Sequence, residues 1–203
     1  MLVKHFHSIK PEIRTLGIDD GRFIPKTKGT ADIVGVVYRG ASWFEGFMHT
    51  KITIDGLDAI EKIVSMIKNS PFYRELRVIF LDGVSFGGFN VVDINELCCL
   101  IDLPVISVTR EKPDLNSIKY ALQNLPDFEV RWQSILNSGK LIEVEIREVD
   151  NPIYIQIAGI LQEDAKKIVK KLSTNSNIPE PLRVAHIIAS RQKLEKTGKN
   201  IKN

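Results

Sequence analysis

Cysteine is scarce in this chain of 203 residues, and its placement excludes two common uses of the residue. The only two cysteines, Cys98 and Cys99, are adjacent, and adjacent cysteines do not form a normal structural disulfide. The sequence contains no CxxC pair and no Cys/His cluster of the kind that binds zinc. We therefore expect a protein of the reducing cytoplasm, in which both cysteines pack as small apolar side chains of a helix.

Long apolar runs are also lacking. No stretch approaches the roughly 20 apolar residues that a membrane-spanning helix needs. The first segment, MLVKHFHSIKPEIR, has no apolar core of the kind found in signal peptides. The sequence therefore predicts no membrane partner and no secretion signal.

Several catalytic motifs are missing. The chain has no HExxH zinc motif, no Walker A motif and no GxGxxG fingerprint. These absences argue against zinc peptidase chemistry and a nucleotide cofactor. The glycine-rich run DGVSFGGFN at 82–90 keeps two interpretations. Backbone N–H groups from Gly83 onward bind a phosphate, or the run is a tight connection between a strand and a helix.

What the chain does contain is typical of one globular domain. Hydrophobic residues make up 43% of it, and the formal net charge is +3. A chain of this length can bury a single core. We predict one domain over residues 1–195 and a basic tail over 196–203. From Leu182 onward six Lys or Arg stand against one acid, which is typical of a solvated terminal segment and compatible with a polyanionic partner.

Hydrophobic periodicity predicts strands and helices in alternation. The expected strands are 14–20, 31–39, 43–53, 76–82, 103–108, 140–147 and 153–159. The expected helices are 58–69, 90–101, 114–123, 126–137, 162–172 and 182–194, the last after a rigid break at Ile178-Pro179-Glu180-Pro181. Antiparallel strands followed by strand–helix alternation predict a mixed α/β sheet flanked by helices. A ribonuclease H-like fold has this pattern, and so do several other α/β folds.

Two apolar strands end in the same way, with an aspartate beside a glycine. LGIDDG at 16–21 places Asp19 and Asp20 at the end of the first strand, and VIFLDG at 78–83 places Asp82 at the end of another. Ligands of open α/β sheets gather at the carboxyl ends of the strands. Two-metal phosphoryl chemistry needs several oxygen ligands around its cations. We therefore predict a divalent-metal site, for Mg²⁺ or Mn²⁺, that contains Asp19 and Asp82.

Three other aspartates have a structural interpretation beside the functional one. Asp55, Asp58 and Asp93 stand where an aspartate commonly caps a helix or forms a turn. Asp55 or Asp58 can cap the helix expected over 58–69. A structural role is at least as well supported for Asp55 and Asp93 as metal binding.

One histidine and one aromatic cluster also have two interpretations each. His186 lies in the last expected helix, where a histidine is more often a surface residue than a catalytic one. Trp43, Phe44 and Phe47 cluster near the third expected strand, where they could stack on bases or pack in the core. We favour core packing for the three aromatic residues.

Six segments of the chain, taken together and in this order, carry a family resemblance. They are LGIDDGRF (16–23), VVYRG (36–40), ITIDGLDA (52–59), VIFLDGVSFGGFNVVD (78–93), LPVISVTREKPD (103–114) and IPEPLRVAH (178–186). As a set they resemble a largely uncharacterised archaeal family, number ninety-nine of the domains of unknown function, which is similar to endonuclease V. Each segment alone is a weak signal, but together they span nearly the whole chain.

The resemblance implies a fold, an activity and a set of site residues. Endonuclease V has a ribonuclease H-like fold and cuts DNA or RNA near inosine with the help of magnesium. By similarity to its Gly-Val-Asp and Asp-Gly motifs, Asp19 and Asp82 are the expected metal ligands. Arg110 stands where endonuclease V has a lysine near phosphate. The segment Pro-Glu-Pro-Leu-Arg-Val-Ala-His makes His186 a neighbour of the metal site.

The chain also departs from the endonuclease V pattern in three places. The His-Pro-Arg element after the Asp-Gly motif is replaced by Ser-Phe-Gly-Gly-Phe-Asn. The Pro-Tyr-Ile-Pro wedge that probes the lesion has no counterpart, which removes the support for inosine specificity. The catalytic glutamate after the third strand is missing, and only Asp55 or Asp58 could take its place.

The sequence as a whole predicts a divalent-metal-dependent phosphodiester hydrolase, a nuclease, that acts on DNA or RNA. In this interpretation Arg110 holds a phosphate, and His186 orients water or metal. The alternative is a non-catalytic module on a ribonuclease H-like fold that binds nucleic acid or a protein partner. A hydrolase of small phosphate compounds or nucleotides is a weaker third interpretation. The sequence does not determine the oligomeric state.

Overall fold

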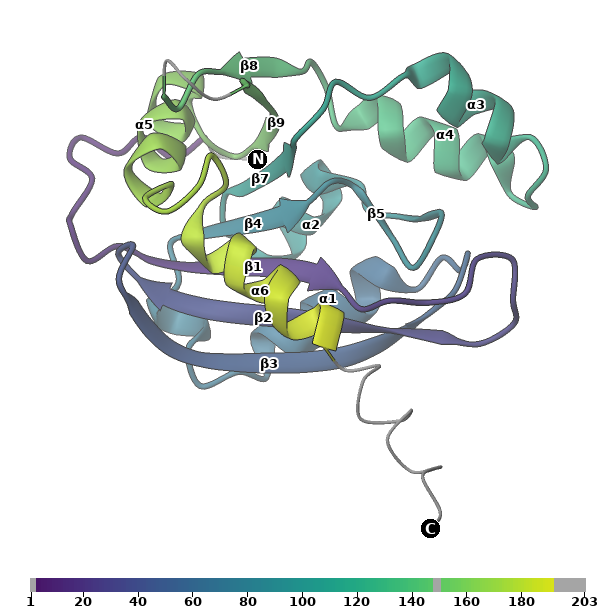
Figure 1. Ribbon diagram of the computed structural model, residues 1–203, viewed down its shortest axis with the longest axis horizontal. Helices are drawn as coiled ribbons and strands as arrows, with labels where there is room; N and C mark the ends of the chain where they lie inside the picture. Colours follow the sequence, from purple (N-terminus) through teal and green to yellow (C-terminus); the bar gives the residue numbers. More distant parts are fainter. Residues whose placement is uncertain (1–2, 148–150, 192–203) are drawn as a thin grey trace, which may run out of the picture.

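The computed structural model describes residues 3–147 and 151–191. Its centre is a seven-stranded sheet in the order β3-β2-β1-β4-β7-β9-β8 (Figure 1). The strands are β1 (Arg14–Asp20), β2 (Thr30–Arg39), β3 (Trp43–Thr53), β4 (Val78–Asp82), β7 (Val105–Thr109), β8 (Ile142–Val144) and β9 (Ile153–Ala158). β1, β2 and β3 are antiparallel, β1, β4 and β7 are parallel, and β9 is antiparallel to both β7 and β8. The expected mixed sheet, antiparallel first and then parallel, is confirmed.

Helices cover both faces of the sheet. α1 (Ala59–Lys68) and α2 (Ile94–Ile101) share one core with β1 and β4, through side chains such as Leu16 and Ile63. α5 (Gln162–Leu172) packs on the other face, and α6 (Glu180–Arg191) crosses β1 and β2 on that face (Figure 1). Because β4 is covered on both sides, its residues 78–81 form a continuous apolar run.

Two further helices form a unit beside the sheet. α3 (Leu115–Leu122) and α4 (Phe128–Asn137) pack on each other and lie beyond the carboxyl end of β7 (Figure 1). A separate cluster around Leu122 and Ile135 fills the space beneath them. A short 3-10 helix, η1 (Tyr73–Glu75), precedes β4.

The helix expected over 90–101 is shorter than predicted. Residues Ser85–Phe86 (β5) and Asn90–Val91 (β6) form a small antiparallel hairpin instead. Gly87 and Gly88 make its turn with φ values of 53° and 93°, a region that glycine enters without strain. The helix starts only at Ile94, because Asp93 caps it by accepting hydrogen bonds from the N–H groups of Asn95 and Glu96.

The last helix also begins earlier than expected. α6 starts at Glu180, so the segment interpreted as a rigid break supplies its first turn. Pro181 is tolerated there because the first turn of a helix needs no N–H donor from it. The expected helix end at Leu194 and the tail over 196–203 lie outside the described residues, so the domain boundary stays a prediction.

The capping expectation for α1 was wrong in its detail. Asp58 holds the N-cap position, but its side chain makes no capping hydrogen bond, and Asp55 does not cap the helix either. The N–H of Ala59 donates to Oδ1 of Asn90 instead. The first turn of α1 is thus tied to the hairpin, 31 residues further along the chain.

The aromatic cluster near β3 is not in the core. Trp43, Phe44 and Phe47 are 61%, 49% and 57% exposed. β3 is an edge strand of the sheet, so its side chains have a neighbouring strand on one side alone. Alternation along a strand does not show that the strand lies at the edge of the sheet, and the core prediction was wrong for this reason.

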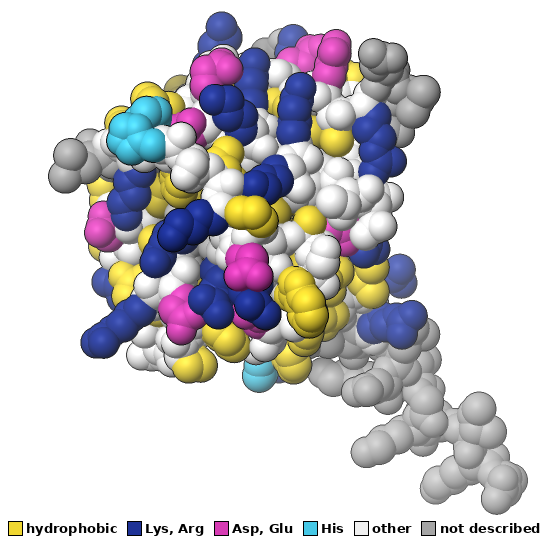
Figure 2. Space-filling model, turned by 90° about the vertical axis from the view of Figure 1, so that its left-hand side faces the viewer, with side chains coloured by type: hydrophobic (Ala, Val, Ile, Leu, Met, Phe, Trp, Pro, Cys, Tyr) yellow, Lys and Arg dark blue, Asp and Glu magenta, His cyan; other side chains and the backbone are white. Residues whose placement is uncertain are grey.

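Charged side chains of both signs occupy the end of the molecule where β1 begins. Figure 2 shows Lys and Arg there among Asp and Glu. Arg14 bonds to Glu45 at 2.6 Å and to Glu75 at 2.5 Å, and Arg39 bonds to Glu45 at 3.0 Å.

The described helices are all too short or too polar to cross a membrane.

Candidate metal centre

Asp19 and Asp82 lie at neighbouring positions because β1 and β4 are adjacent and parallel. The register pairs Ile18 with Leu81, so both aspartates follow directly at the carboxyl ends of their strands. The main chain at these strand ends is fixed by the ladder and by the apolar residues before it, which are fully buried. This edge of the sheet is where sequence analysis placed the site.

His186 reaches the same place from the opposite end of the chain. α6 lies unusually close to β1, since a Cβ atom on Gly17 would be 2.3 Å from the carbonyl carbon of Pro181. Only glycine permits this contact. His186 lies five residues further along α6. Its Nδ1 atom is 2.7 Å from Oδ2 of Asp19 and 3.9 Å from Oδ2 of Asp82.

Asp19, Asp82 and His186 form a group with the dimensions of a metal site. Each offers one ligand atom, and these atoms lie within 4.8 Å of one another. Across residues 3–147 and 151–191, this is the one such group of three or more. Carboxylate oxygens suit Mg²⁺ and Mn²⁺, and an imidazole nitrogen extends the range toward Mn²⁺ and other transition metals.

The electrostatics of the group favour a cation. Burial raises the pKa of the Asp19 carboxyl to about 7, and the negative charges of Asp82 and Asp20 act in the same direction. The hydrogen bond to His186 opposes that rise. Burial also raises the pKa of Asp20. Carboxylates crowded in this way stay ionised when a positive charge joins them, so the donor set fits a divalent ion.

Arg110 is placed beside the group, as expected from the resemblance. It follows the end of β7, and its Nη1 lies 3.6 Å from Oδ2 of Asp82. Its side chain is about half exposed and can swing toward a ligand. A phosphate role for Arg110 stays a prediction.

The glycine-rich run does not offer a free phosphate cradle. The N–H of Gly83 donates to the carbonyl of Val108 at 2.9 Å. The N–H of Gly87 donates to Oδ2 of Asp20, and the N–H of Phe89 donates to Oδ1 of Asp55. Gly83 was expected to bind a phosphate through its N–H group. That N–H group already donates to Val108, so it is not available to a phosphate. The structural alternative, a tight connection, describes the segment.

Asp55 and Asp58 are not part of the metal group. Asp55 holds the hairpin, through its bond to Phe89 and through its own N–H, which donates to Gly87 at 2.9 Å. Asp58 accepts from Thr53 N–H at 3.0 Å and from Asn90 Nδ2 at 2.7 Å. Both carboxylates accept hydrogen bonds from the hairpin, and Asp58 also accepts from the end of β3, so the geometry gives no support to either as the third metal carboxylate.

An apolar pocket lies close to Asp82 in the chain, because Gly83 is one of its lining residues. It has a volume of about 360 Å³ and opens next to Gly83 and Thr109. Ile118, Ile135 and Leu136 supply apolar walls from α3 and α4. The walls come from segments distant in sequence, and no local motif could have indicated it.

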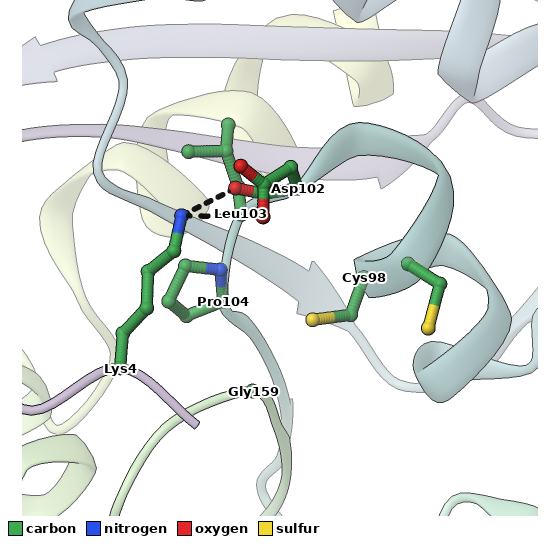
Figure 3. A pocket seen from close by; sticks show the side chains of 7 residues that line it. Lys4, Cys98, Asp102, Leu103, Pro104 and Gly159 are labelled. Atoms are coloured by element: carbon green, nitrogen blue, oxygen red, sulfur yellow. Dashed lines mark hydrogen bonds and ion pairs between the residues drawn. The ribbon is translucent and has the colours of Figure 1, made fainter. Parts of the chain in front are cut away.

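A second pocket holds the cysteines and is unsuited to catalysis. Lys4 there bonds to Asp102, with Cys98 across from it and Pro104 between (Figure 3). Burial raises the pKa of the Cys98 thiol to about 11, so the sulfur stays protonated and unreactive. Cys98 is buried in α2 as expected, whereas Cys99 is exposed.

Comparison of sequences identifies relatives along almost the whole chain. The model of the family described as endonuclease dU matches residues 11–192. A UPF0215 protein of Methanothermobacter thermautotrophicus is 50% identical over 187 residues, which cover 92% of this chain and 90% of that protein. A UPF0215 protein of Thermococcus gammatolerans is 42% identical and covers 90% of this chain and 93% of its own. The resemblance to an archaeal, endonuclease V-like family is confirmed.

Comparison of structures shows the fold. A protein of unknown function from Archaeoglobus fulgidus has a TM-score of 0.78 at 39% identity, over 88% of this chain and 96% of its own. Endonuclease V of Ciona intestinalis, in complex with DNA that contains inosine, has a TM-score of 0.61 at 19% identity, over 92% and 87%. Endonuclease V of Bacillus subtilis gives 0.60 at 15%, over 94% and 86%. The expected ribonuclease H-like fold is confirmed.

Proposed function

The chain belongs to the endonuclease dU family, and on that premise we propose that it is a divalent-metal-dependent nuclease that hydrolyses phosphodiester bonds in nucleic acid. The observation that carries the proposal is the convergence of Asp19, Asp82 and His186 within 4.8 Å at the carboxyl end of the sheet. The description of the family and the DNA complex of a structural neighbour support nucleic acid as the substrate class.

Each residue of the group has a chemical task in this proposal. Asp19 and Asp82 hold Mg²⁺ or Mn²⁺, and the bound ion supplies an activated water and charge neutralisation at the phosphate. His186 keeps Asp19 in place through Nδ1, and its half-exposed ring can carry a proton at Nε2. Arg110 leaves Asp82 to bond a phosphate oxygen, a charge-assisted contact that an arginine makes well.

The apolar pocket gives the substrate a place to insert a base. Enzymes that act at a single nucleotide commonly take its base out of the stack and hold it in a recess. The pocket of about 360 Å³ beside Gly83 lies next to Asp82 and is walled by aliphatic side chains. The name of the family points to deoxyuridine as the first nucleoside to test.

The deciding experiment measures cleavage of labelled oligonucleotides. DNA and RNA strands with one deoxyuridine, with one inosine or with neither are incubated with Mg²⁺ or Mn²⁺. We expect metal-dependent cleavage that is lost in Asp19→Asn and Asp82→Asn. Asp102→Asn is the matched control, because Asp102 is exposed and asparagine tolerates its left-handed backbone. Full activity in either site variant would remove the assignment.

The second candidate function is a binding module without catalysis. The metal group contains two carboxylates within the described residues, and neither Asp55 nor Asp58 supplies a third. Under this alternative the protein binds Mn²⁺ and nucleic acid, but leaves every oligonucleotide intact. The same assay, with binding measured in parallel, separates the two functions.

A further inference from the structure

The loop between β1 and β2 concentrates positive charge beside the metal centre. Residues 21–29 read GRFIPKTKG, with three cations and no acid. The loop leaves the sheet directly after Asp20 and projects beyond the end of β1 (Figure 1). Arg22, Lys26 and Lys28 are exposed, and none of them has an ion-pair partner in the described part of the chain.

This lack of partners sets the loop apart from the basic residues at the other end of the sheet. At the opposite end of β1, Arg14 and Arg39 are neutralised by glutamates. Lys51, on the strand next to the loop, lies 3.8 Å from Asp32. The three loop cations keep their full charge for an external anion.

The loop is held in a defined shape. The N–H of Gly21 donates to the carbonyl of Asp32 at 2.7 Å, and the N–H of Ile54 donates to the carbonyl of Gly29 at 3.0 Å. Phe23 packs against the main core between these two anchors. Lys26 adopts φ of 60°, a left-handed conformation that a lysine rarely takes. The loop therefore presents its cations from a fixed base.

A polar cavity separates the loop from the last turn of α6. It has a volume of about 260 Å³ and is lined by Arg22, Lys28 and Ala189 among others. Ala189 follows His186 by three residues, which is about one helical turn. The cavity also contains Asp32, whose charge is engaged by Lys51. The cationic loop and the metal group thus border the same stretch of α6.

We infer that this loop binds the phosphate backbone of the nucleic acid next to the scissile bond, through Arg22, Lys26 and Lys28. The inference rests on the proposed function for the identity of the polyanion. Arg22 follows Asp19 by three residues, so their Cα atoms lie at most about 11 Å apart. Phosphates of a duplex strand follow one another at about 3.4 Å along the axis. A strand with one phosphate at Asp19 brings its neighbours within reach of the loop.

The loop cations also offset the repulsion between the aspartates of the metal group and a phosphate. Asp19, Asp20 and Asp82 repel a phosphate that approaches without metal. Cations nearby attract the strand and hold it while a phosphate enters the group. Such contacts carry no base information, so the loop sets affinity and position, whereas the apolar pocket is left to select the base.

The test measures binding of a fluorescent oligonucleotide duplex by anisotropy, with Ca²⁺ in place of the catalytic ion and over a series of salt concentrations. Lys26→Gly removes one charge and relieves the left-handed backbone, so the substitution adds no backbone strain to the loop. We expect about a threefold or greater loss of affinity, and a salt slope smaller by about 1. The triple change Arg22→Gln, Lys26→Gly, Lys28→Gln is expected to lose at least tenfold.

The matched control removes three lysines from α5, which lies far from the loop (Figure 1). Lys166→Gln, Lys167→Gln, Lys170→Gln changes the net charge by the same amount and is expected to leave affinity within twofold. Equal losses in both triple variants, or no loss in either, overturn the loop assignment, while cleavage by the wild type would still uphold the nuclease. A wild-type protein that binds no duplex at any salt concentration overturns the loop assignment as well. The cleavage assay then decides separately whether the proposed function fails.

Discussion

Gly17 and Pro181 are in backbone contact, and this contact sets the position of the whole of α6. A Cβ atom on Gly17 would lie 2.3 Å from the carbonyl carbon of Pro181 and 2.4 Å from the nitrogen of Leu182. No side chain can rotate away to relieve such a clash, because both partners are main chain. His186 meets Asp19 because the sequence keeps this position free of a side chain.

Gly17→Ala is therefore expected to push α6 off β1 and to separate His186 from Asp19. We expect the free energy of unfolding to fall by about 1–3 kcal/mol, as for other overpacked sites. The rise in melting temperature caused by Mn²⁺ should shrink. Gly139→Ala is the control, since Gly139 has φ of 79° and no atom near its Cβ position. It should lower stability without affecting the Mn²⁺ response, and an equal Mn²⁺ response in both variants would contradict the role of the contact.

The raised pKa of Asp19 makes metal-free stability depend on pH. Because burial raises this pKa from 3.8 to about 7, the folded state holds the proton more tightly than the unfolded chain. The resulting stabilisation is complete below about pH 4 and is lost as the pH rises to about 7. Mn²⁺ displaces the proton, so its stabilising effect should grow across the same interval. Melting temperatures at pH 5 and pH 8, with Mn²⁺ and with a chelator, measure both trends, and Asp19→Asn should flatten them.

Asp58 should prove to be a structural residue. Its carboxylate accepts hydrogen bonds from Thr53 and Asn90, which link β3, α1 and the hairpin. Asp58→Ala leaves these donors without partners, and we expect unfolding to become easier by about 1–3 kcal/mol. The Mn²⁺-induced shift in melting temperature should equal that of the wild type. A lost Mn²⁺ response would instead restore Asp58 as the third metal carboxylate.

Arg131 is the buried group that ties α4 to the hairpin and to the loop between β3 and α1. Only 2% exposed, it donates to the carbonyls of Pro126, Gly56, Asp55 and Phe89. Arg131→Lys cannot reproduce this planar set of donors, and we expect a loss of about 2–4 kcal/mol in unfolding free energy. Arg74→Lys, at an exposed arginine, should cost almost nothing. Amide hydrogen exchange at residues 85–91 should quicken in the first variant alone.

The parts of the site that the sequence revealed are those set by short patterns. Asp19 and Asp82 follow apolar strands, and adjacent parallel strands then bring their ends together without further information. His186 could be placed only through the family resemblance, because its meeting with Asp19 depends on the crossing of α6 over Gly17. A single glycine in a strand does not by itself indicate which helix approaches it.

The sequence did not reveal the roles of residues whose contacts lie far away in the chain. Asp55 and Asp58 looked like candidate ligands because their type and spacing fit, yet N–H groups of the hairpin and of β3 reach them first. Arg131 gave no signal, since its four acceptors are carbonyls that every residue carries. Trp43, Phe44 and Phe47 were predicted as core residues, but they lie on an edge strand and are exposed.

The bond between His186 and Asp19 spans 167 residues of sequence, and this has a consequence for the newly made protein. On the ribosome, β1 emerges early, whereas α6 can dock only after nearly all other elements have left the exit tunnel. Until then Asp19 and Asp82 have no imidazole beside them, because the long chain between β1 and α6 must first be ordered. A growing chain therefore carries an incomplete group, and the docking of α6 brings His186 to Asp19 and Asp82.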